Sequence, residues 1–245
     1  MRRLVLAVGF VWVGFIGWSA VAEGVTADTV QRLGAASYTT RLAETERLMH
    51  DFGVTPEALA ALIVQARAGA GGEAGGEVAA RAERALRHRL LAQYRKELSQ
   101  PGQRGSLGIQ HRQVLLSVPG GGLEATAAVL VTHVLPGFPA AGQLRVGDLI
   151  LRFNDAGVPG VGEAPEAFGR VIQARQLGER VQMEVLRDGS VVSLTLELAG
   201  SPALQRMYAR DVRRPSGLAE DVARWLDRQM ETLVTAARVE AAAGG

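Results

Sequence analysis

The side chains that could act as nucleophiles, general bases or metal ligands are few in this sequence. None of the 245 residues is a cysteine, which excludes cysteine nucleophiles, thiolate zinc sites, iron–sulfur clusters and disulfides. Ser106 follows Arg104 by two residues and so belongs to no Gly-x-Ser-x-Gly motif, and no His-Glu-x-x-His zinc motif occurs. We therefore expect no enzyme activity, no metal and no cofactor. The histidines to be placed are His50, His88, His111 and His133.

Two further patterns are weak candidates for ligand binding. Three glycines at residues 120–122 lack the lysine and the strand-to-helix context of a phosphate-binding loop. Four arginines between residues 81 and 89 are partly offset by nearby glutamates, which is typical of a solvated helix face.

The chain has 27 Lys and Arg against 25 Asp and Glu, and the counts become equal without the two arginines at its start. A neutral chain is not expected to bind nucleic acid.

The first 22 residues predict a targeting segment. Arg2 and Arg3 precede an unbroken apolar run over residues 4–18, which is followed by Ser19-Ala20-Val21-Ala22. This order of basic, apolar and small residues is typical of a signal peptide, cleaved here after Ala22. The alternative is an uncleaved inner-membrane anchor, because residues 4–22 are near the minimum length for crossing a bilayer. In both cases we expect the rest of the chain to be exported, to the periplasm or as a secreted protein.

Residues 23–99 predict a small all-helical unit. Apolar residues recur at helical spacing through most of this range. Thr55 is a suitable N-cap, and Pro56 fits the first position of the helix that follows. The elements expected after this cap are a helix over 56–66, a glycine-rich loop over 69–76 and a last helix over 77–98.

Short motifs in this unit carry a family resemblance. They are Leu33-Gly34, Tyr38, Thr40-Arg41, Glu46-Arg47-Leu48, Ala58-Leu59-Ala60-Ala61-Leu62, Glu77-Val78 and Arg81-Ala82-Glu83. Together they resemble a HEAT-like helical repeat, in which a first helix packs on a second and the next begins after a short turn. The glycine-rich insertion departs from that pattern, and a single repeat cannot bury its apolar face alone. The alternative is a helical cap packed on the next domain.

Residues 100–200 predict a compact α+β domain. Five short runs have strand-like composition, and the last two alternate apolar and polar residues. Asp188-Gly189 between these two is a two-residue hairpin turn of type I′. A helix over residues 165–174 is expected between the third and fourth runs. The five runs cover residues 114–116, 128–131, 149–151, 181–185 and 191–196.

Residues 201–245 predict a C-terminal helical extension. Ser216 is a suitable cap for a helix whose apolar residues form a stripe, with charged residues opposite. We expect the stripe to pack against the neighbouring domain, and the alternative is a dimer or partner-binding face. The stripe consists of Leu218, Val222, Trp225, Leu226, Met230, Leu233 and Ala237.

The most specific pattern in the chain spans residues 103–199. Its segments are Gly105-Ser106-Leu107-Gly108-Ile109, then Val134-Leu135-Pro136-Gly137-Phe138-Pro139-Ala140-Ala141, then Leu144-Arg145-Val146-Gly147-Asp148-Leu149-Ile150, and finally Leu186-Arg187-Asp188-Gly189. In order, spacing and residue type they resemble a PDZ domain of the bacterial HtrA type, here without the protease domain. The resemblance implies a partly open β-barrel or sandwich with a groove helix. Two departures are Asn154-Asp155 in place of Asn-Gly and a first helix shortened to a single turn.

The resemblance also implies a peptide-binding site. A peptide adds as an antiparallel strand beside the edge that begins at Ile109, and backbone N–H groups of the preceding turn bind its terminal carboxylate. Ala164 occupies a groove position where some PDZ domains carry histidine, which implies a preference for apolar peptide ends. His111 has the alternative of being an ordinary surface residue. The expected site residues are Gly105, Ser106, Leu107, Gly108, Ile109, Gln110, His111, Ala164, Phe168, Val171 and Ile172.

Three functions are compatible with these patterns. The preferred one is an exported, non-enzymatic adaptor that binds apolar C-terminal or extended peptide segments of other proteins. The second is a structural scaffold or oligomer whose groove is occupied by its own helices. The third is a regulatory subunit that presents substrates to a separate envelope protease. Membrane contact is expected only through residues 1–22, if these are not cleaved.

Overall fold

The computed structural model describes most of the chain that follows the expected leader. Residues 1–22, the glycines at 120–122, Ala164 and Ser216 lie outside the described residues. None of the described helices combines the length and the apolar composition that crossing a bilayer requires. The described ranges are 25–51, 53–69, 73–117, 125–154, 156–157, 167–208 and 217–243.

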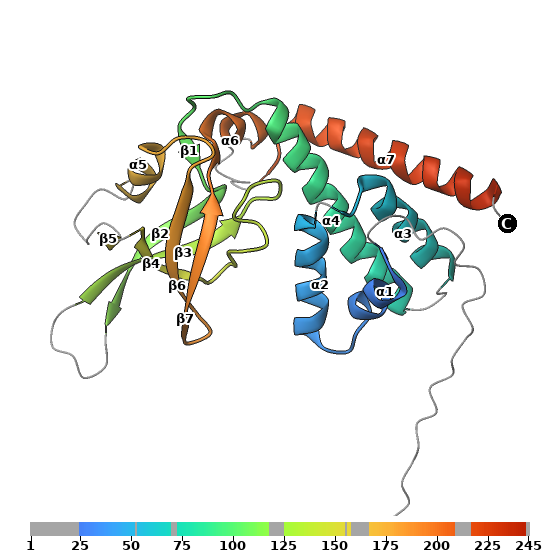
Figure 1. Cartoon of the computed structure of the whole chain (residues 1–245), viewed down its shortest axis with the longest axis horizontal. Helices are drawn as coiled ribbons and strands as arrows, with labels where there is room; N and C mark the ends of the chain where they lie inside the picture. The colour runs from blue at the N-terminus through green and yellow to red at the C-terminus, as the bar shows by residue number, and fades with distance from the viewer. Residues whose placement is uncertain are drawn as a thin grey trace, which may run out of the picture.

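Four N-terminal helices form one layer of the molecule, drawn in blue to green in Figure 1. The first three begin at side chains that accept hydrogen bonds from the first free N–H groups. Thr26 belongs to a capping box, Ser37 caps the second helix, and Thr55 Oγ1 accepts from the N–H of Ala58 at 3.1 Å. The expected cap at Thr55 is therefore confirmed. The helices are α1 (Ala27–Leu33), α2 (Tyr38–His50), α3 (Pro56–Gly69) and α4 (Glu73–Glu97).

The glycine-rich loop is shorter than the predicted range of 69–76, so this prediction was wrong in its extent. Helix α3 continues to Gly69 and α4 already begins at Glu73, so Gly75 and Gly76 are helical. A glycine inside a helix costs about 1 kcal/mol relative to alanine. Burial of the α4 side chains against α3, with Leu86 fully buried, offsets that cost.

The C-terminal helix α7 (Glu220–Ala243) packs its apolar stripe on the N-terminal helices. Val222 and Leu226 are fully buried, and the rings of Trp225 and Tyr94 lie 4.7 Å apart. The stripe is thus core packing, as expected, but it lies on α3 and α4 of the N-terminal unit and not on the neighbouring domain of residues 100–200 (Figure 1). The face that an isolated helical repeat leaves exposed is covered by a segment from the far end of the chain. The short helix α6 (Ser201–Met207) leads into this region.

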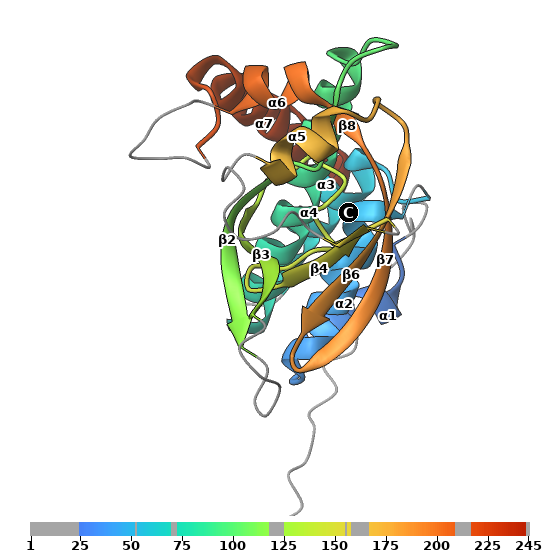
Figure 2. The same ribbon diagram turned by 90° about the vertical axis from the view of Figure 1, so that its left-hand side faces the viewer.

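The middle of the chain forms an antiparallel sheet with one helix, which confirms the α+β expectation. The strand order is β2-β3-β4-β6-β7, so β2 and β7 are the two edges (Figure 2). Helix α5 (Ala167–Gln173) packs Phe168 into the apolar core of this sheet. The main strands are β2 (Ile109–Ser117), β3 (Ala125–Val134), β4 (Leu149–Phe153), β6 (Arg180–Arg187) and β7 (Ser190–Glu197), and the short ones are β1 (Gly105–Ser106), β5 (Ala156–Gly157) and β8 (Ala199–Gly200).

The hairpin between β6 and β7 has the expected turn. Asp188 and Gly189 have φ angles of 50° and 79°. Positive φ at both central residues defines a type I′ turn, whose twist matches that of the flanking strands. The register follows from this turn, because Arg187 pairs with Ser190.

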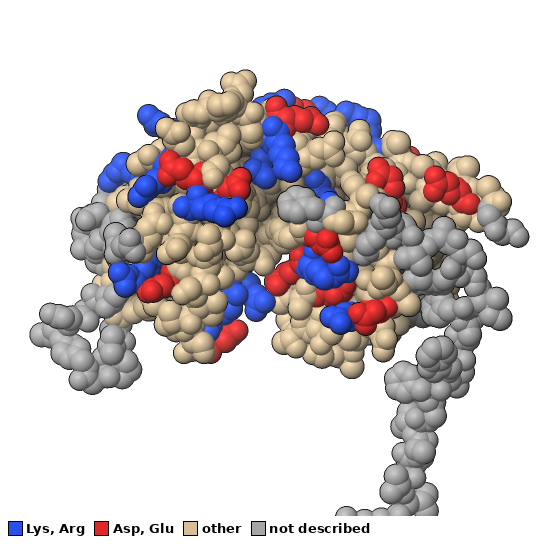
Figure 3. Space-filling view, viewed as in Figure 1, with Lys and Arg blue, Asp and Glu red and all other residues tan. Residues whose placement is uncertain are grey.

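The helical layer and the sheet are joined through the loop between β3 and β4. Phe138 in this loop is only 1% exposed and belongs to the apolar core of the helices, together with Leu135. The ring of Phe138 lies 5.9 Å from that of Tyr208, which follows α6. Basic and acidic residues are interspersed on the visible face of the whole molecule (Figure 3), as the balanced composition predicts.

Candidate peptide-binding groove

The edge strand β2 and helix α5 form the two sides of the candidate groove. Among the described strands, β2 has a neighbour on one side only, β3. Near the start of β2, the His111 ring packs edge-on against Phe168 of α5 at 5.1 Å. A β-bulge between Gln110 and His111 accentuates the bend of the strand at this point. An edge strand beside a helix is an arrangement that accepts an additional strand.

The turn before β2 directs one backbone N–H away from the sheet. Gly108 adopts a φ of +72°, and its carbonyl accepts a hydrogen bond from the N–H of Leu135 at 2.9 Å. The peptide bond to Ile109 is trans, so its N–H points opposite to that carbonyl. The Ile109 N–H therefore faces the open edge of β2.

The neighbouring peptide unit is oriented in the same manner. The carbonyl of Leu107 accepts from the N–H of Ala140 at 3.4 Å, on the inner side of the turn. The Gly108 N–H on the opposite side makes a long bond of 3.3 Å to Ser106 Oγ. The Gly108 N–H is thus bonded within the turn, and the Ile109 N–H is the donor that this geometry directs to the open edge.

Gly105 has a structural role in this region. Its N–H donates to the carbonyl of Arg175 at 2.7 Å, so it is not directed at the groove. A Cβ at this position would lie 2.6 Å from Leu198 Cδ1 and 3.1 Å from the carbonyl oxygen of Ile172 in α5. The absence of a side chain lets β1 approach the end of α5 closely.

The apolar residues expected to line the groove differ in exposure. Leu107, Phe168 and Ile172 are buried in the domain core and form the support beneath the groove. Ile109 is half-buried, and Val171 is 38% exposed. The buried face of α5 is therefore formed by Phe168 and Ile172, and Val171 is the accessible apolar residue of this helix. Ala164 lies outside the described residues.

His111 is half-buried, and its ring contacts Phe168 of α5. Burial lowers the pKa of His111. The imidazole is therefore neutral at pH 7, which suits a groove for apolar side chains.

Phe138 is a residue of this region that the sequence did not single out as functional. A Cβ on Gly108 would lie 2.1 Å from the Cβ of Phe138, so the aromatic residue packs directly against the glycine. Phe138 thus supports the turn from below. The motif Gly137-Phe138-Pro139 was visible in the sequence, but its contact with Gly108 depends on tertiary structure.

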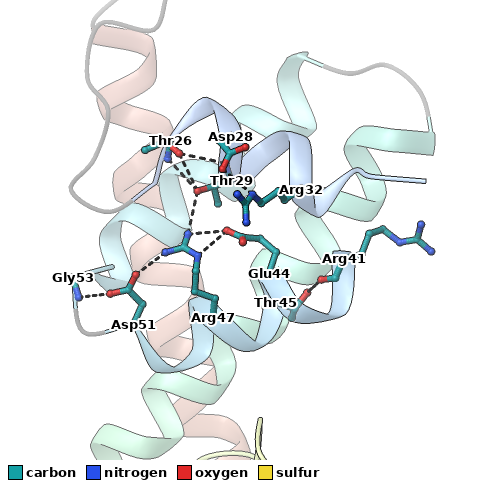
Figure 4. A network of polar contacts seen from close by, with 10 residues as sticks. All are labelled: Thr26, Asp28, Thr29, Arg32, Arg41, Glu44, Thr45, Arg47, Asp51 and Gly53. Atoms are coloured by element: carbon teal, nitrogen blue, oxygen red, sulfur yellow. Dashed lines mark hydrogen bonds and ion pairs between the residues drawn. The ribbon is translucent and has the colours of Figure 1, made fainter. Parts of the chain in front are cut away.

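A cluster of acidic and basic residues in the helical layer has a structural role (Figure 4). The guanidinium of Arg47 bonds Glu44 at 2.7 Å and Asp51 at 2.6 Å, and it also donates to Thr29 at 3.1 Å. Asp51 in turn accepts from the N–H of Gly53. These bonds tie α1, α2 and the following turn together. No group of three or more His, Asp or Glu side chains that could hold a metal occurs in the described part of the chain.

His88 lies at the junction between the two layers, where it accepts a hydrogen bond. Its Nδ1 receives the N–H of Gly137 at 3.1 Å. Burial, with smaller effects from His50, Arg95 and Arg89, lowers the pKa of His88 from 6.5 to about 3. A neutral ring is required, because a protonated Nδ1 cannot accept this bond.

The free energy of unfolding is expected to fall on acidification because of His88. Below pH 6.5 the unfolded chain binds a proton at this residue and the folded chain does not, so stability is lost as the pH falls toward about 3. The loss is about 1.4 kcal/mol per pH unit, or about 2 kcal/mol at pH 5. Urea unfolding should show that the free energy of unfolding falls less between pH 7 and pH 5 in His88→Asn than in the wild type. Asparagine retains an acceptor for the Gly137 N–H but does not titrate in this range.

The exposed His133 provides the matched control for this comparison. The variant His133→Asn makes the same substitution at an exposed position of β3. Equal pH dependence in the His88→Asn variant and the wild type would contradict the prediction.

An antiparallel sheet with a helix beside its edge strand and a glycine turn at the strand's start defines a class of peptide-binding modules. Residues 105–198 match the family model described as the PDZ domain. This part of the chain is a PDZ domain, and the sequence-based expectation is confirmed. The matched segment begins after α4 and ends before α6.

Two curated relatives have the same name, "Probable periplasmic serine endoprotease DegP-like". The protein from Marinomonas sp. (strain MWYL1) is 31% identical over 90 residues, which cover 36% of this chain and 18% of the relative. The protein from Pseudomonas savastanoi pv. phaseolicola (strain 1448A / Race 6) is 34% identical over 101 residues, which cover 40% and 20%. The chain therefore spans about a fifth of the length of these relatives.

Two solved structures of an HtrA-type protease, AlgW with a decapeptide, are also similar. One has 28% sequence identity and a TM-score of 0.31 and covers 49% of this chain and 34% of the protease. A variant of the protease has 25% identity and a TM-score of 0.33 and covers 46% and 34%.

Proposed function

We propose that this chain is a non-enzymatic adaptor that binds apolar C-terminal or extended peptide segments by strand addition to β2. One observation carries the proposal: the N–H of Ile109 points out of the sheet edge beside α5, next to the left-handed Gly108. Main-chain hydrogen bonds to the edge would provide affinity. Apolar contacts with Val171 and Ile109 would provide selectivity.

The electrostatics near the turn favour a negatively charged peptide end. A cavity of about 470 Å³ at the C-terminal end of α5 is lined by Arg104, Arg170 and Arg175 among other residues. The backbone of Arg175 accepts from the N–H of Gly105, three residues before Gly108, and its guanidinium is partly balanced by Glu179 at 3.7 Å. Positive charge at the mouth of a site attracts anions and raises their local concentration.

The location proposed for this adaptor is the periplasm or another exported site. Support comes from the signal-peptide pattern of residues 1–22 and from the periplasmic DegP-like names of the relatives. The relatives are named as proteases, and only their PDZ region is similar to this chain. The non-enzymatic role rests on the lack of a serine-hydrolase or zinc-protease motif in the sequence.

The alternative of a groove filled by the C-terminal helix is not favoured. The apolar stripe of α7 lies against α3 and α4, on the opposite side of the junction from β2. Presentation of bound peptides to a separate envelope protease remains compatible with the adaptor role. It would be tested by capture of a protease on the immobilised chain, in the presence and absence of a competing peptide.

Peptide binding is tested on the full chain, because residues 100–200 alone would expose Phe138 and Leu135. A panel of fluorescent ten-residue peptides with apolar C-termini is titrated and followed by anisotropy. Binding is expected to be weakened by amidation of the peptide end and by N-methylation of peptide units that pair with β2. No binding by any peptide, or binding that neither modification weakens, would contradict the proposal.

A charge at the accessible residue of the groove helix is expected to weaken binding selectively. Val171→Glu should reduce affinity at least about tenfold for free-carboxylate peptides, through lost apolar contact and like-charge repulsion. The same peptide with an amidated end should be affected less. The control is Val191→Glu, at an exposed valine of the opposite edge strand β7, which should leave affinity unchanged.

A further inference from the structure

The loop over residues 135–140 contacts the turn that opens the groove. The N–H of Leu135 donates to Gly108 and the N–H of Ala140 donates to Leu107, at 2.9 and 3.4 Å. Phe138 packs against Gly108 so closely that a Cβ on the glycine would overlap it. The conformation of the turn is therefore set by this loop.

The same loop is held on its other side by helix α4 and by the residue after α6. Gly137 is bonded through both its backbone groups, since its N–H donates to His88 Nδ1 at 3.1 Å and its carbonyl accepts from Arg95 Nε at 2.7 Å. The Tyr208 hydroxyl donates to the carbonyl of Pro136 at 2.5 Å. Three side chains from outside the PDZ domain thus bind two consecutive residues of the loop.

Packing adds to these hydrogen bonds. The Arg95 guanidinium lies 5.9 Å from the centre of the Phe138 ring, and this ring is 1% exposed. Gly137 lies against the backbone of α4 with φ +83°, and a Cβ there would be 2.6 Å from the Cβ of Leu91. The tip of the loop is embedded in the helical core and has little freedom to move independently of α4.

We infer that helix α4 and Tyr208 position the carboxylate-binding turn, so that the helical layer is part of the peptide-binding device. His88, Arg95 and Tyr208 are positioning residues that act on Gly108 and Ile109 through the loop. The effect of these residues on peptide affinity rests on the proposed function. Their effect on the conformation of the turn does not depend on any peptide. By reciprocity, a bound peptide also strengthens the docking of the helices.

The test compares two arginine variants of the same helix in the full chain. Arg95→Met removes the bond to Gly137 and retains most of the aliphatic packing. Arg87→Met is the control, because Arg87 is half-exposed and its ion pair with Asp227, at 3.9 Å, lies away from the loop. Both variants are examined by amide NMR and hydrogen exchange of residues 107–109 without peptide, and then by peptide titration.

We expect Arg95→Met to shift the Gly108 and Ile109 amide signals and to speed their exchange, with little change for Arg87→Met. Peptide affinity should fall about tenfold, the factor that corresponds to one lost hydrogen bond of about 1.4 kcal/mol. Tyr208→Phe should act in the same direction. His88→Leu should weaken binding and His88→Asn should restore it, because the asparagine again accepts from Gly137.

The outcomes separate this inference from the proposed function. Unchanged amide signals and unchanged affinity in Arg95→Met would overturn the positioning role. If the wild type binds no peptide but the turn signals still respond to Arg95→Met, the proposed function fails and the structural link stands. An equal loss of affinity in Arg87→Met and Arg95→Met would show a general loss of stability and overturn the inference.

Discussion

Replacing Gly108 by alanine is expected to lower the free energy of unfolding by about 2–5 kcal/mol. The strained φ of +72° costs an alanine about 1–2 kcal/mol. The new Cβ would lie 2.1 Å from Phe138 Cβ, and overpacking of a buried residue adds about 1–3 kcal/mol. The loss is measured by urea denaturation followed by circular dichroism.

Gly189 is the matched control for this substitution. Its φ is +79°, and a Cβ at this position would meet no heavy atom within 4 Å beyond the glycine and its two chain neighbours. Gly189→Ala should therefore show only the backbone strain, about 1–2 kcal/mol. Equal destabilisation by the two variants would mean that Phe138 moves aside at no cost, and the support of the turn by this residue would be refuted.

Asp148→Ala is expected to destabilise the PDZ domain by about 3–5 kcal/mol, the usual cost of breaking a buried ion pair. Asp148 is 2% exposed and receives the Arg187 side chain in two bonds of 2.8 and 2.6 Å. It also accepts from the N–H of Arg145 at 2.8 Å. The variant leaves the Arg187 charge, whose side chain is 16% exposed, without its carboxylate partner.

The exposed pair of Arg224 and Glu220 on α7 is the control, with a distance of 2.7 Å and both side chains mostly in solvent. Glu220→Ala should change stability by at most about 0.5 kcal/mol. The double variant Asp148→Leu with Arg187→Met should regain much of the loss, since no unpaired charge remains. A loss no larger in Asp148→Ala than in Glu220→Ala would refute the prediction.

Elements set by local chemistry were predictable from the sequence. The cap at Thr55 and the I′ turn at Asp188-Gly189 depend on residues within a few positions of one another. The strands β6 and β7 followed from the alternation of apolar and polar side chains on a half-buried sheet. The PDZ domain was recognisable because its motifs combine such local signals in a fixed order.

The site was only partly predictable. The turn before β2 and the strand edge were expected, but the exposures of His111, Phe168 and Val171 were not, since burial depends on the neighbours that folding brings together. The helical state of Gly75 and Gly76 was missed because tertiary packing outweighs a propensity of about 1 kcal/mol per residue.

The sequence was sufficient to indicate a PDZ domain flanked by helices, in a chain with balanced charge and no cysteine. Which surface each helix covers was decided by tertiary structure, as the packing of α7 on α3 shows. The most consequential contact of this kind joins Phe138 to Gly108 on one side and to α4 on the other. Such contacts link residues far apart in the sequence, and their energies depend on shape and distance in three dimensions.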